Sequence, residues 1–229
     1  MSRTPMAFEM VPLGDSALLV TCAEPKLDWV ALGHRIRALP ECLDAVPAYR
    51  SLTLHFASTL PDPEGRFGPA LGIAIAALLK HPPKPTDAAQ HILPVCYHPS
   101  LAPDLDAVAR HCGLTTDEVI ARHSAPLYRV AFLGFAPGFP FLTGLDPSLN
   151  APRHATPRQS VRAGSVGIAG NQTGIYPAAS PGGWQLIGCC PLPLINFNQD
   201  PPTRLQPGDQ LRLEPITLAR FHELLEAQP

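Results

Sequence analysis

Glycine is concentrated in one part of this 229-residue chain. Ten of its 17 glycines lie between residues 134 and 188, while 29 prolines are spread along the whole sequence. Glycine permits corners and bulges in strands, and proline cuts helices short. Residues 134–215 are therefore predicted to form short strands joined by tight turns, a pattern typical of a closed or nearly closed β-barrel.

The N-terminal part predicts a small α+β sandwich. Hydrophobic spacing and turn residues indicate strands at 7–22 (two strands around a turn) and 49–57, and helices at 28–39 and 66–80, with room for another strand at 42–48. Asp28 is the expected N-cap of the first helix, and Pro40 ends it. Residues 80–90 carry several prolines and no apolar period, so they are predicted to link a domain at 1–85 to a barrel domain at 91–229.

The second part opens with α/β elements before the glycine-rich region. The predicted elements are strands at 91–97 and 127–135 and helices at 104–113, 115–123 and 217–227. Thr115 and Glu118 have the spacing of a capping box, and Gly113 ends the helix before it. The fold class is therefore α+β, with a small sandwich domain followed by a β-barrel.

Composition excludes several classes of function. The net charge is −2 and no dense run of Lys or Arg is present, so nucleic-acid binding is not expected. No apolar stretch reaches the length of a membrane span and no signal peptide is evident, which predicts a cytoplasmic protein without a membrane partner. The six cysteines form no CxxC pair, so no metal site is expected and the thiols are interpreted as reduced.

The glycine-rich region is poor in acids. Between residues 134 and 188 the only charged side chains are Asp146, Arg153, Arg158 and Arg162. Arginine binds carboxylates and phosphates through two parallel hydrogen bonds, and glycine N–H groups form anion-binding concavities. Arg153 and Arg158, each preceded by proline, are candidate anion ligands. Gln172 and Tyr176 are candidate ligand-orienting groups.

The stretch GFAPGFPFLTGL at 134–145 combines large rings with helix- and strand-breaking residues. Phe135, Phe139 and Phe141 would line an apolar wall while Gly138 bends the backbone. A pocket wall, a subunit interface and a barrel core with tight corners all remain compatible with this pattern. His123, at a predicted helix end, is compatible with either a structural or a catalytic role.

Longer ordered motifs carry a family resemblance. FLGFAPGFPFL, two Pro-Arg pairs, AGSVGIAGNQTGIYP and SPGGWQLIG follow one another between residues 132 and 188. This order resembles the family of 5-oxoprolinase B subunits, which includes sporulation-kinase inhibitors and the allophanate hydrolase subunit 1 or urea carboxylase carboxyltransferase domain. The resemblance implies a cyclophilin-like barrel and two partners, the C and A subunits. With them, it implies an ATP-hydrolysing cyclic-amide hydrolase that converts 5-oxoproline to L-glutamate.

The resemblance also suggests site residues. The expected catalytic residues are His123, Arg158 and Tyr176. The expected substrate-binding residues are Gly138, Phe139, Pro140, Arg153, Ser165, Gln172 and Thr173. ATP is the expected cofactor, bound here or in a partner subunit. Two alternatives remain open: a regulatory protein that inhibits a sensor histidine kinase, and a carboxyltransferase or allophanate hydrolase subunit of urea metabolism.

Overall fold

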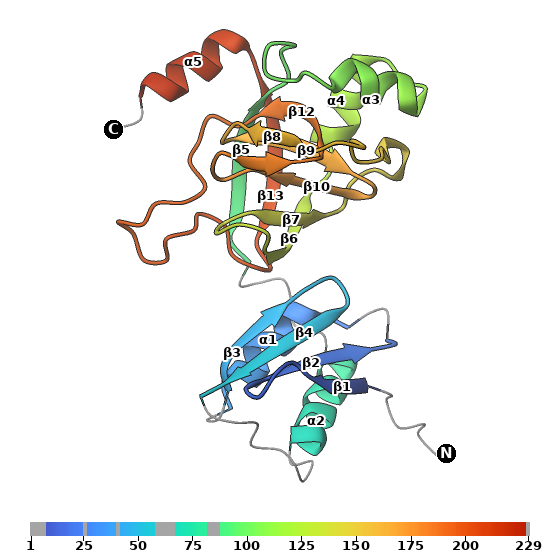
Figure 1. Ribbon diagram of the computed structural model, residues 1–229, viewed down its shortest axis with the longest axis vertical. Helices are drawn as coiled ribbons and strands as arrows, with labels where there is room; N and C mark the ends of the chain where they lie inside the picture. Colours follow the sequence, from blue (N-terminus) through green and yellow to red (C-terminus); the bar gives the residue numbers. More distant parts are fainter. Residues whose placement is uncertain (1–7, 25–26, 40–41, 58–66, 82–87, 228–229) are drawn as a thin grey trace. The chain divides into compact units, whose positions relative to one another are not determined.

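The computed structural model describes residues 8–24, 27–39, 42–57, 67–81 and 88–227. The chain divides into two compact units, Met1–Asp87 and Ala88–Pro229. Figure 1 shows an open sheet with two helices in the first unit and a strand-rich barrel in the second. Each unit has its own hydrophobic core. The α+β class with a barrel, predicted from the glycine pattern, is confirmed.

The first unit is a four-stranded antiparallel sheet with two helices on one face. Its elements are β1 (Phe8–Pro12), β2 (Ala17–Cys22), α1 (Trp29–Arg37), β3 (Cys42–Pro47), β4 (Ser51–Phe56) and α2 (Phe67–Lys80). The strand order is β1-β2-β4-β3. Leu32 from α1 and Leu71 from α2 are buried with Leu52 of the sheet, so alternate strand residues face the helices. The predicted elements are confirmed, and Pro40 lies outside the described residues.

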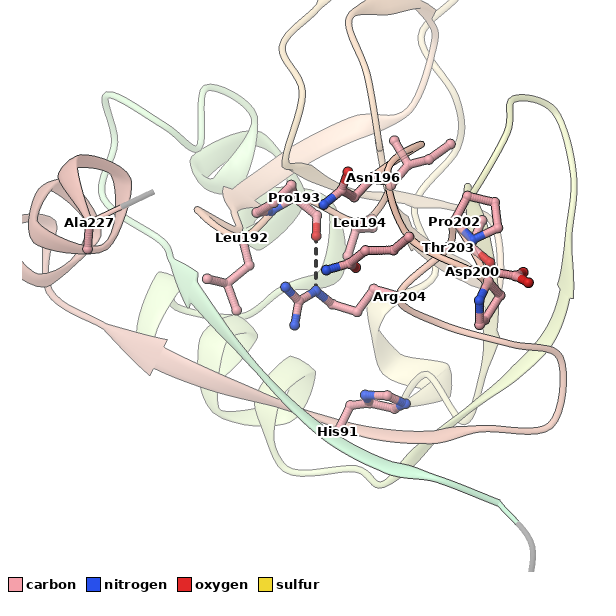
Figure 2. A pocket seen from close by; sticks show the side chains of 13 residues that line it. His91, Leu192, Pro193, Leu194, Asn196, Asp200, Pro202, Thr203, Arg204 and Ala227 are labelled. Atoms are coloured by element: carbon pink, nitrogen blue, oxygen red, sulfur yellow. Dashed lines mark hydrogen bonds between the residues drawn. The ribbon is translucent and has the colours of Figure 1, made fainter. Parts of the chain in front are cut away.

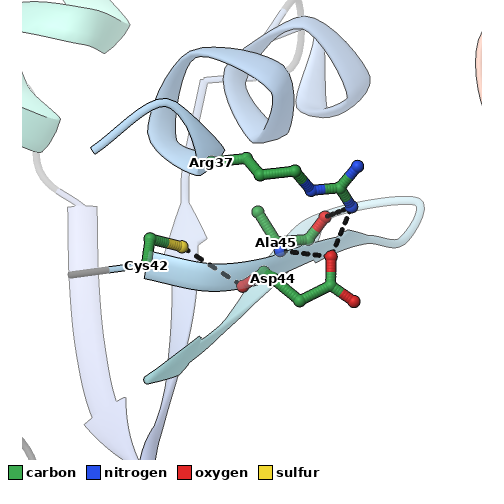
Figure 3. Close-up of polar contacts among 4 residues, drawn as sticks. All are labelled: Arg37, Cys42, Asp44 and Ala45. Carbon is green, nitrogen blue, oxygen red and sulfur yellow. Dashed lines mark hydrogen bonds and ion pairs between the residues drawn. The ribbon is translucent and has the colours of Figure 1, made fainter. Parts of the chain in front are cut away.

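Local contacts fix where α1 begins and ends. The Asp28 side chain accepts a hydrogen bond from the Ala31 N–H at 3.0 Å, which confirms it as the N-cap. At the other end, Arg37 pairs with Asp44 and donates to the carbonyl of Ala45 at 3.1 Å (Figure 3). A cation in the last turn also interacts favourably with the helix dipole. These contacts hold the helix against β3.

The second unit is built around a closed seven-stranded barrel. Its strands are β5 (Gln90–Cys96), β6 (Tyr128–Leu133), β7 (Pro140–Thr143), β9 (Ser165–Ala169), β10 (Gln172–Ile175), β12 (Gln185–Cys189) and β13 (Gln210–Ile216). They follow the order β10-β7-β6-β13-β5-β12-β9, and β9 pairs with β10 to close the barrel. A separate two-stranded sheet pairs β8 (Arg158–Val161) with β11 (Ser180–Gly182).

Helices cover the outside of this barrel. They are α3 (Leu105–Cys112), α4 (Thr116–Ser124), the 3₁₀ helix η2 (Pro147–Leu149) and α5 (Leu218–Glu226). The helices α3 and α4 lie side by side against β12 and β13, whereas α5 contacts β5 (Figure 1). The capping box of Thr115 and Glu118 is present, and Gly113 ends α3 in the left-handed conformation. Both local predictions are therefore confirmed.

Candidate functional site

An aromatic cavity of about 150 Å³ opens on the barrel. Its lining residues are Phe135, Phe139, Phe141, Arg153, His154, Pro157, Tyr176, Gly182, Gly183 and Trp184. The centroid of the Phe139 ring lies 5.2 Å from that of Tyr176 and 5.4 Å from that of Trp184, both in edge-to-face contact. Such contacts favour a fixed arrangement of rings. The three phenylalanines predicted to form an apolar wall therefore line one cavity.

Glycine makes this cavity possible because it lets backbone and rings approach closely. A Cβ on Gly182 would lie 2.4 Å from the Tyr176 hydroxyl oxygen, and one on Gly174 would lie 2.7 Å from the Pro140 carbonyl oxygen. Gly138 has a φ of 75° in the turn before Phe139. Phe135 also has a positive φ, 67°, which is unusual for a residue with a side chain. Its ring stays 65% exposed at the cavity.

Arg153 supplies a positive charge at the cavity. Its guanidinium carbon lies 5.9 Å from the centre of the Trp184 ring, within the range of a cation–π contact. Among the described residues no carboxylate pairs with this guanidinium. Two hydrogen bonds hold the loop on both sides of Arg153. The side-chain Nε2 of Gln185 donates to the Pro152 carbonyl at 2.8 Å, and the His154 backbone N–H donates to the Gly183 carbonyl at 2.8 Å.

Arg158 is paired with a carboxylate that lies outside the glycine-rich region. Its Nη2 donates to Oδ1 of Asp104 at 2.7 Å, and the Leu186 N–H donates to Oδ2 at 2.7 Å. Burial alone would raise the pKa of Asp104. Hydrogen bonds from Arg158 and Leu186, together with the nearby imidazole of His154, outweigh it, so the pKa lies below its usual value and the carboxylate is ionised.

This pairing corrects the predicted charge balance around the site. The expectation of free arginines counted acids only between residues 134 and 188, and Asp104 lies outside that window. Arg158 therefore does not line the aromatic cavity as a free cation, although its Nη1 is buried without a hydrogen-bond partner among the described residues. Arg153 is the arginine that lines the cavity.

His123 lies in the barrel core rather than at the aromatic cavity. Its side chain is fully buried, with Nδ1 2.8 Å from the Tyr97 hydroxyl and Nε2 3.0 Å from the Thr173 hydroxyl. The Thr173 hydroxyl donates to the carbonyl of Gly167, so it accepts from Nε2–H, and Tyr97 donates to Nδ1. Burial lowers the pKa of His123 to about 3. His123, expected as a catalytic residue, is thus held in the core with both ring nitrogens engaged and is not among the residues that line the aromatic cavity.

The other predicted residues divide into two groups. Phe139, Arg153 and Tyr176 line the cavity, while Gly138 and Pro140 shape its turn. Ser165, Gln172 and Thr173 lie on β9 and β10 and are not among the lining residues. Burial raises the pKa of Tyr176, and a backbone hydrogen bond at Trp184 and nearby arginines only partly offset this, so its hydroxyl stays protonated. It can donate a hydrogen bond at neutral pH.

Three residues of the site were assigned no role from sequence. Trp184 was within the motif SPGGWQLIG, and its large ring could have marked it as a wall residue. His154 lies between the two Pro-Arg pairs, and its titratable imidazole is the one signal that the sequence gives for it. Nothing in the sequence marks Asp104 as a site residue except its position before a predicted helix, because its partners Arg158 and His154 are 50 or more residues away.

A larger cavity of about 790 Å³ lies elsewhere on the barrel domain (Figure 2). It is lined by His91, Ala227 and residues of the loop at 192–204. Arg204 points into it and donates from Nε to the Pro193 carbonyl at 3.0 Å. None of the four buried, unpartnered side-chain atoms among the described residues belongs to its lining, whereas His154 lines the aromatic cavity. We therefore place the candidate site at the aromatic cavity.

Two other kinds of feature are missing from the described part of the chain. No group of three His, Cys, Asp or Glu side chains is placed to hold a metal ion. No helix there has both the length and the apolar character of a membrane span.

Comparison with known proteins decides the family. The family model for the carboxyltransferase domain, subdomain C and D, matches residues 8–205. The 5-oxoprolinase B subunit of Bacillus subtilis is 37% identical over 233 residues, covering 96% of this chain and 97% of that protein. The Escherichia coli O157:H7 protein of the same name is 41% identical over 201 residues, covering 86% and 88%. This chain belongs to the family of 5-oxoprolinase B subunits.

Solved structures agree with this family assignment. A conserved uncharacterized protein from Pyrococcus horikoshii is 37% identical, with a TM-score of 0.57, covering 93% of this chain and 100% of that one. The Kluyveromyces lactis urea carboxylase matches 95% of this chain and 22% of its own, with a TM-score of 0.69 and 21% identity. At 21% identity, the likeness to urea carboxylase shows a shared fold and says nothing about the substrate.

Proposed function

We propose that this chain is the B subunit of an ATP-dependent complex that opens 5-oxoproline to L-glutamate, and that its aromatic cavity binds the cyclic amide. The observation that carries the proposal is a small ring-lined cavity at which Arg153 pairs with no carboxylate of the described residues, in a chain whose relatives are named as 5-oxoprolinase B subunits. The substrate is complementary to both features, because it has a small ring and a carboxylate.

The cavity suits a small ring better than a nucleotide. Pockets for drug-sized ligands are typically about 300–1,000 Å³, whereas this one has about 150 Å³. The faces of Phe139 and Trp184 would contact the ring methylenes, and Arg153 would hold the carboxylate by charge-assisted hydrogen bonds. A nucleoside triphosphate does not fit this cavity, so we assign ATP to a site that a partner subunit provides or completes.

The composition of the cavity indicates that the partners supply part of the chemistry. Among its described lining residues there is no carboxylate to act as a base. An amide is a poor electrophile, and ATP would activate its carbonyl oxygen for attack. Tyr176, which keeps its proton, would donate to an oxygen on which charge develops. Homologues of the C and A subunits are the proposed partners in a heteromeric complex of glutamate metabolism.

The reaction itself tests the proposed function. The chain would be mixed with the homologues of the C and A subunits from the same host, and glutamate release from 5-oxoproline would be followed with and without ATP. We expect release only with ATP and all three proteins. A full complement that releases no glutamate, or a chain that binds a sensor kinase in place of these partners, would contradict the proposal.

Changing Arg153 to Gln tests the anion contact. Losing one charge-assisted hydrogen bond costs about 1.5–3 kcal/mol, so the KM for 5-oxoproline should rise about 10-fold to 150-fold. The matched control is Arg110→Gln on the exposed face of α3, which should leave KM unchanged. Equal KM values for the two variants would remove Arg153 from the site.

The two alternative functions, a kinase inhibitor and a carboxyltransferase or allophanate hydrolase subunit of urea metabolism, have no comparable support. The urea carboxylase likeness extends to the fold alone at 21% identity, and no described feature selects a kinase as the partner. All six cysteines are free thiols. That state fits the reducing cytoplasm, which is the compartment we propose for the complex.

A further inference from the structure

His154 lies between a buried carboxylate and the aromatic cavity. Its Nε2 is 3.2 Å from Oδ2 of Asp104, and the imidazole lines the cavity with 31% of the side chain exposed. Among the described residues no group bonds to Nδ1. The side chain thus has one nitrogen against a carboxylate and the other available to a ligand.

Asp104 is held rigidly enough to orient this imidazole. Its carboxylate accepts from Arg158 and from the Leu186 N–H, and its own N–H donates to the Leu186 carbonyl at 2.9 Å. Nε2 of His154 has no well-directed hydrogen bond in this ligand-free structure. Such contacts often align only when the substrate is bound. When the Asp104 carboxylate accepts a hydrogen bond from Nε2–H of His154, the proton is on Nε2 and Nδ1 keeps its lone pair.

We infer that His154 is the proton-transfer residue of the ring-opening step and that Asp104 positions it. The inference rests on the proposed function. As water adds to the activated carbonyl carbon and the new C–O bond forms, Nδ1 takes a proton from the water. As the ring C–N bond breaks, the imidazolium returns that proton to the ring nitrogen. The imidazole ends as it began. The ring would open to an acyl phosphate, from which a second water would release the phosphoryl group as phosphate.

The surroundings of His154 support this role. The other charged or titratable groups at the cavity or at Asp104 are Arg153, Arg158 and the protonated Tyr176. Arginine keeps its proton at all working pH values, and Tyr176 cannot act as a base near neutral pH. His123 is buried in the core with both nitrogens engaged. His154 is therefore the one base among the described residues that line the cavity.

Replacing His154 with Ala in the reconstituted complex tests the inference. We expect kcat to fall about 10²- to 10⁴-fold, as for loss of a general acid–base, while KM changes little. Added imidazole should restore part of the rate, because a small base can enter the space that the side chain leaves. The matched control is Thr156→Ala on the same exposed loop, which should keep full activity and show no response to imidazole.

Asp104→Asn tests the positioning role separately. This change keeps the shape of the side chain and removes its charge, so kcat should fall while added imidazole has no effect. Binding of 5-oxoproline, followed by Trp184 fluorescence in a Trp29→Phe background, should remain. A His154→Ala complex as active as Thr156→Ala would overturn the inference alone. A wild-type complex without activity would overturn the proposed function instead.

Discussion

Replacing Gly164 with Ala is expected to prevent the barrel from folding stably. A Cβ there would lie 2.2 Å from the carbonyl oxygen of Cys190 and 3.2 Å from Sγ of Cys189, and the residue has a φ of 83°. The clash is with backbone, and the glycine cannot move away easily. Its N–H donates to the Tyr176 carbonyl at 2.7 Å, and its carbonyl accepts from Cys190 at 2.8 Å.

The expected cost exceeds about 4 kcal/mol, which is a large share of the roughly 5–15 kcal/mol of a typical domain. Urea unfolding followed by Trp184 fluorescence, with Trp29 changed to Phe, would measure it. Gly170→Ala is the matched control because Gly170 has a φ of 58° and nothing lies within 4 Å of the added Cβ. That control should lose only about 1–2 kcal/mol, the cost of left-handed backbone. Similar losses in the two variants would show that the close approach to Cys190 does not matter.

The barrel should lose stability in acid through His123. Burial holds its pKa in the folded chain at about 3, below the usual 6.5 that the unfolded chain has. Between these values the unfolded state binds more protons, so the free energy of unfolding rises with pH and falls as pH drops below about 6.5. The slope approaches about 1.4 kcal/mol per pH unit from this group, and the loss ends near pH 3.

A difference measurement isolates this effect. His123→Gln cannot titrate, so the stability advantage of the wild type over it should be largest near pH 7 and shrink between pH 6 and pH 4. Carboxylates titrate equally in both proteins and cancel. His111→Gln, at an exposed position in the last turn of α3, should show a difference that does not vary with pH in this way. Parallel stability curves for His123→Gln and the wild type would contradict the burial of a neutral imidazole.

Local signals allowed the elements to be predicted from sequence. Asp28 and the Thr115–Glu118 pair cap their helices by contacts within three residues, which the sequence displays directly. The residues of β4 alternate between buried and more exposed positions. The barrel was predictable because glycines such as Gly138 and Gly164 occur where strands must turn tightly. These features depend on neighbours in the chain.

The candidate site was only partly predictable because its contacts join distant segments. Phe139 and Tyr176 were identified through two separate motifs, and both line the cavity. The burial of His123 could not be predicted, because the spacing of residues along the chain does not report burial. Asp104 pairs with Arg158 across 54 positions. Only the closed barrel brings these two side chains together, and their pairing changes which arginine is available to a ligand.

The pairing of β5 with β13 has a consequence for biosynthesis. These strands form a parallel ladder from Gln90–Gln210 to Cys96–Ile216, which joins the first strand of the barrel to its last. A chain emerging from the ribosome can form the first unit early, but the seven-stranded ring has a gap until Ile216 is released. Contacts between such distant residues form slowly. The half-made ring would expose strand edges that attract other chains, so this protein should depend on chaperones most before β13 has been made.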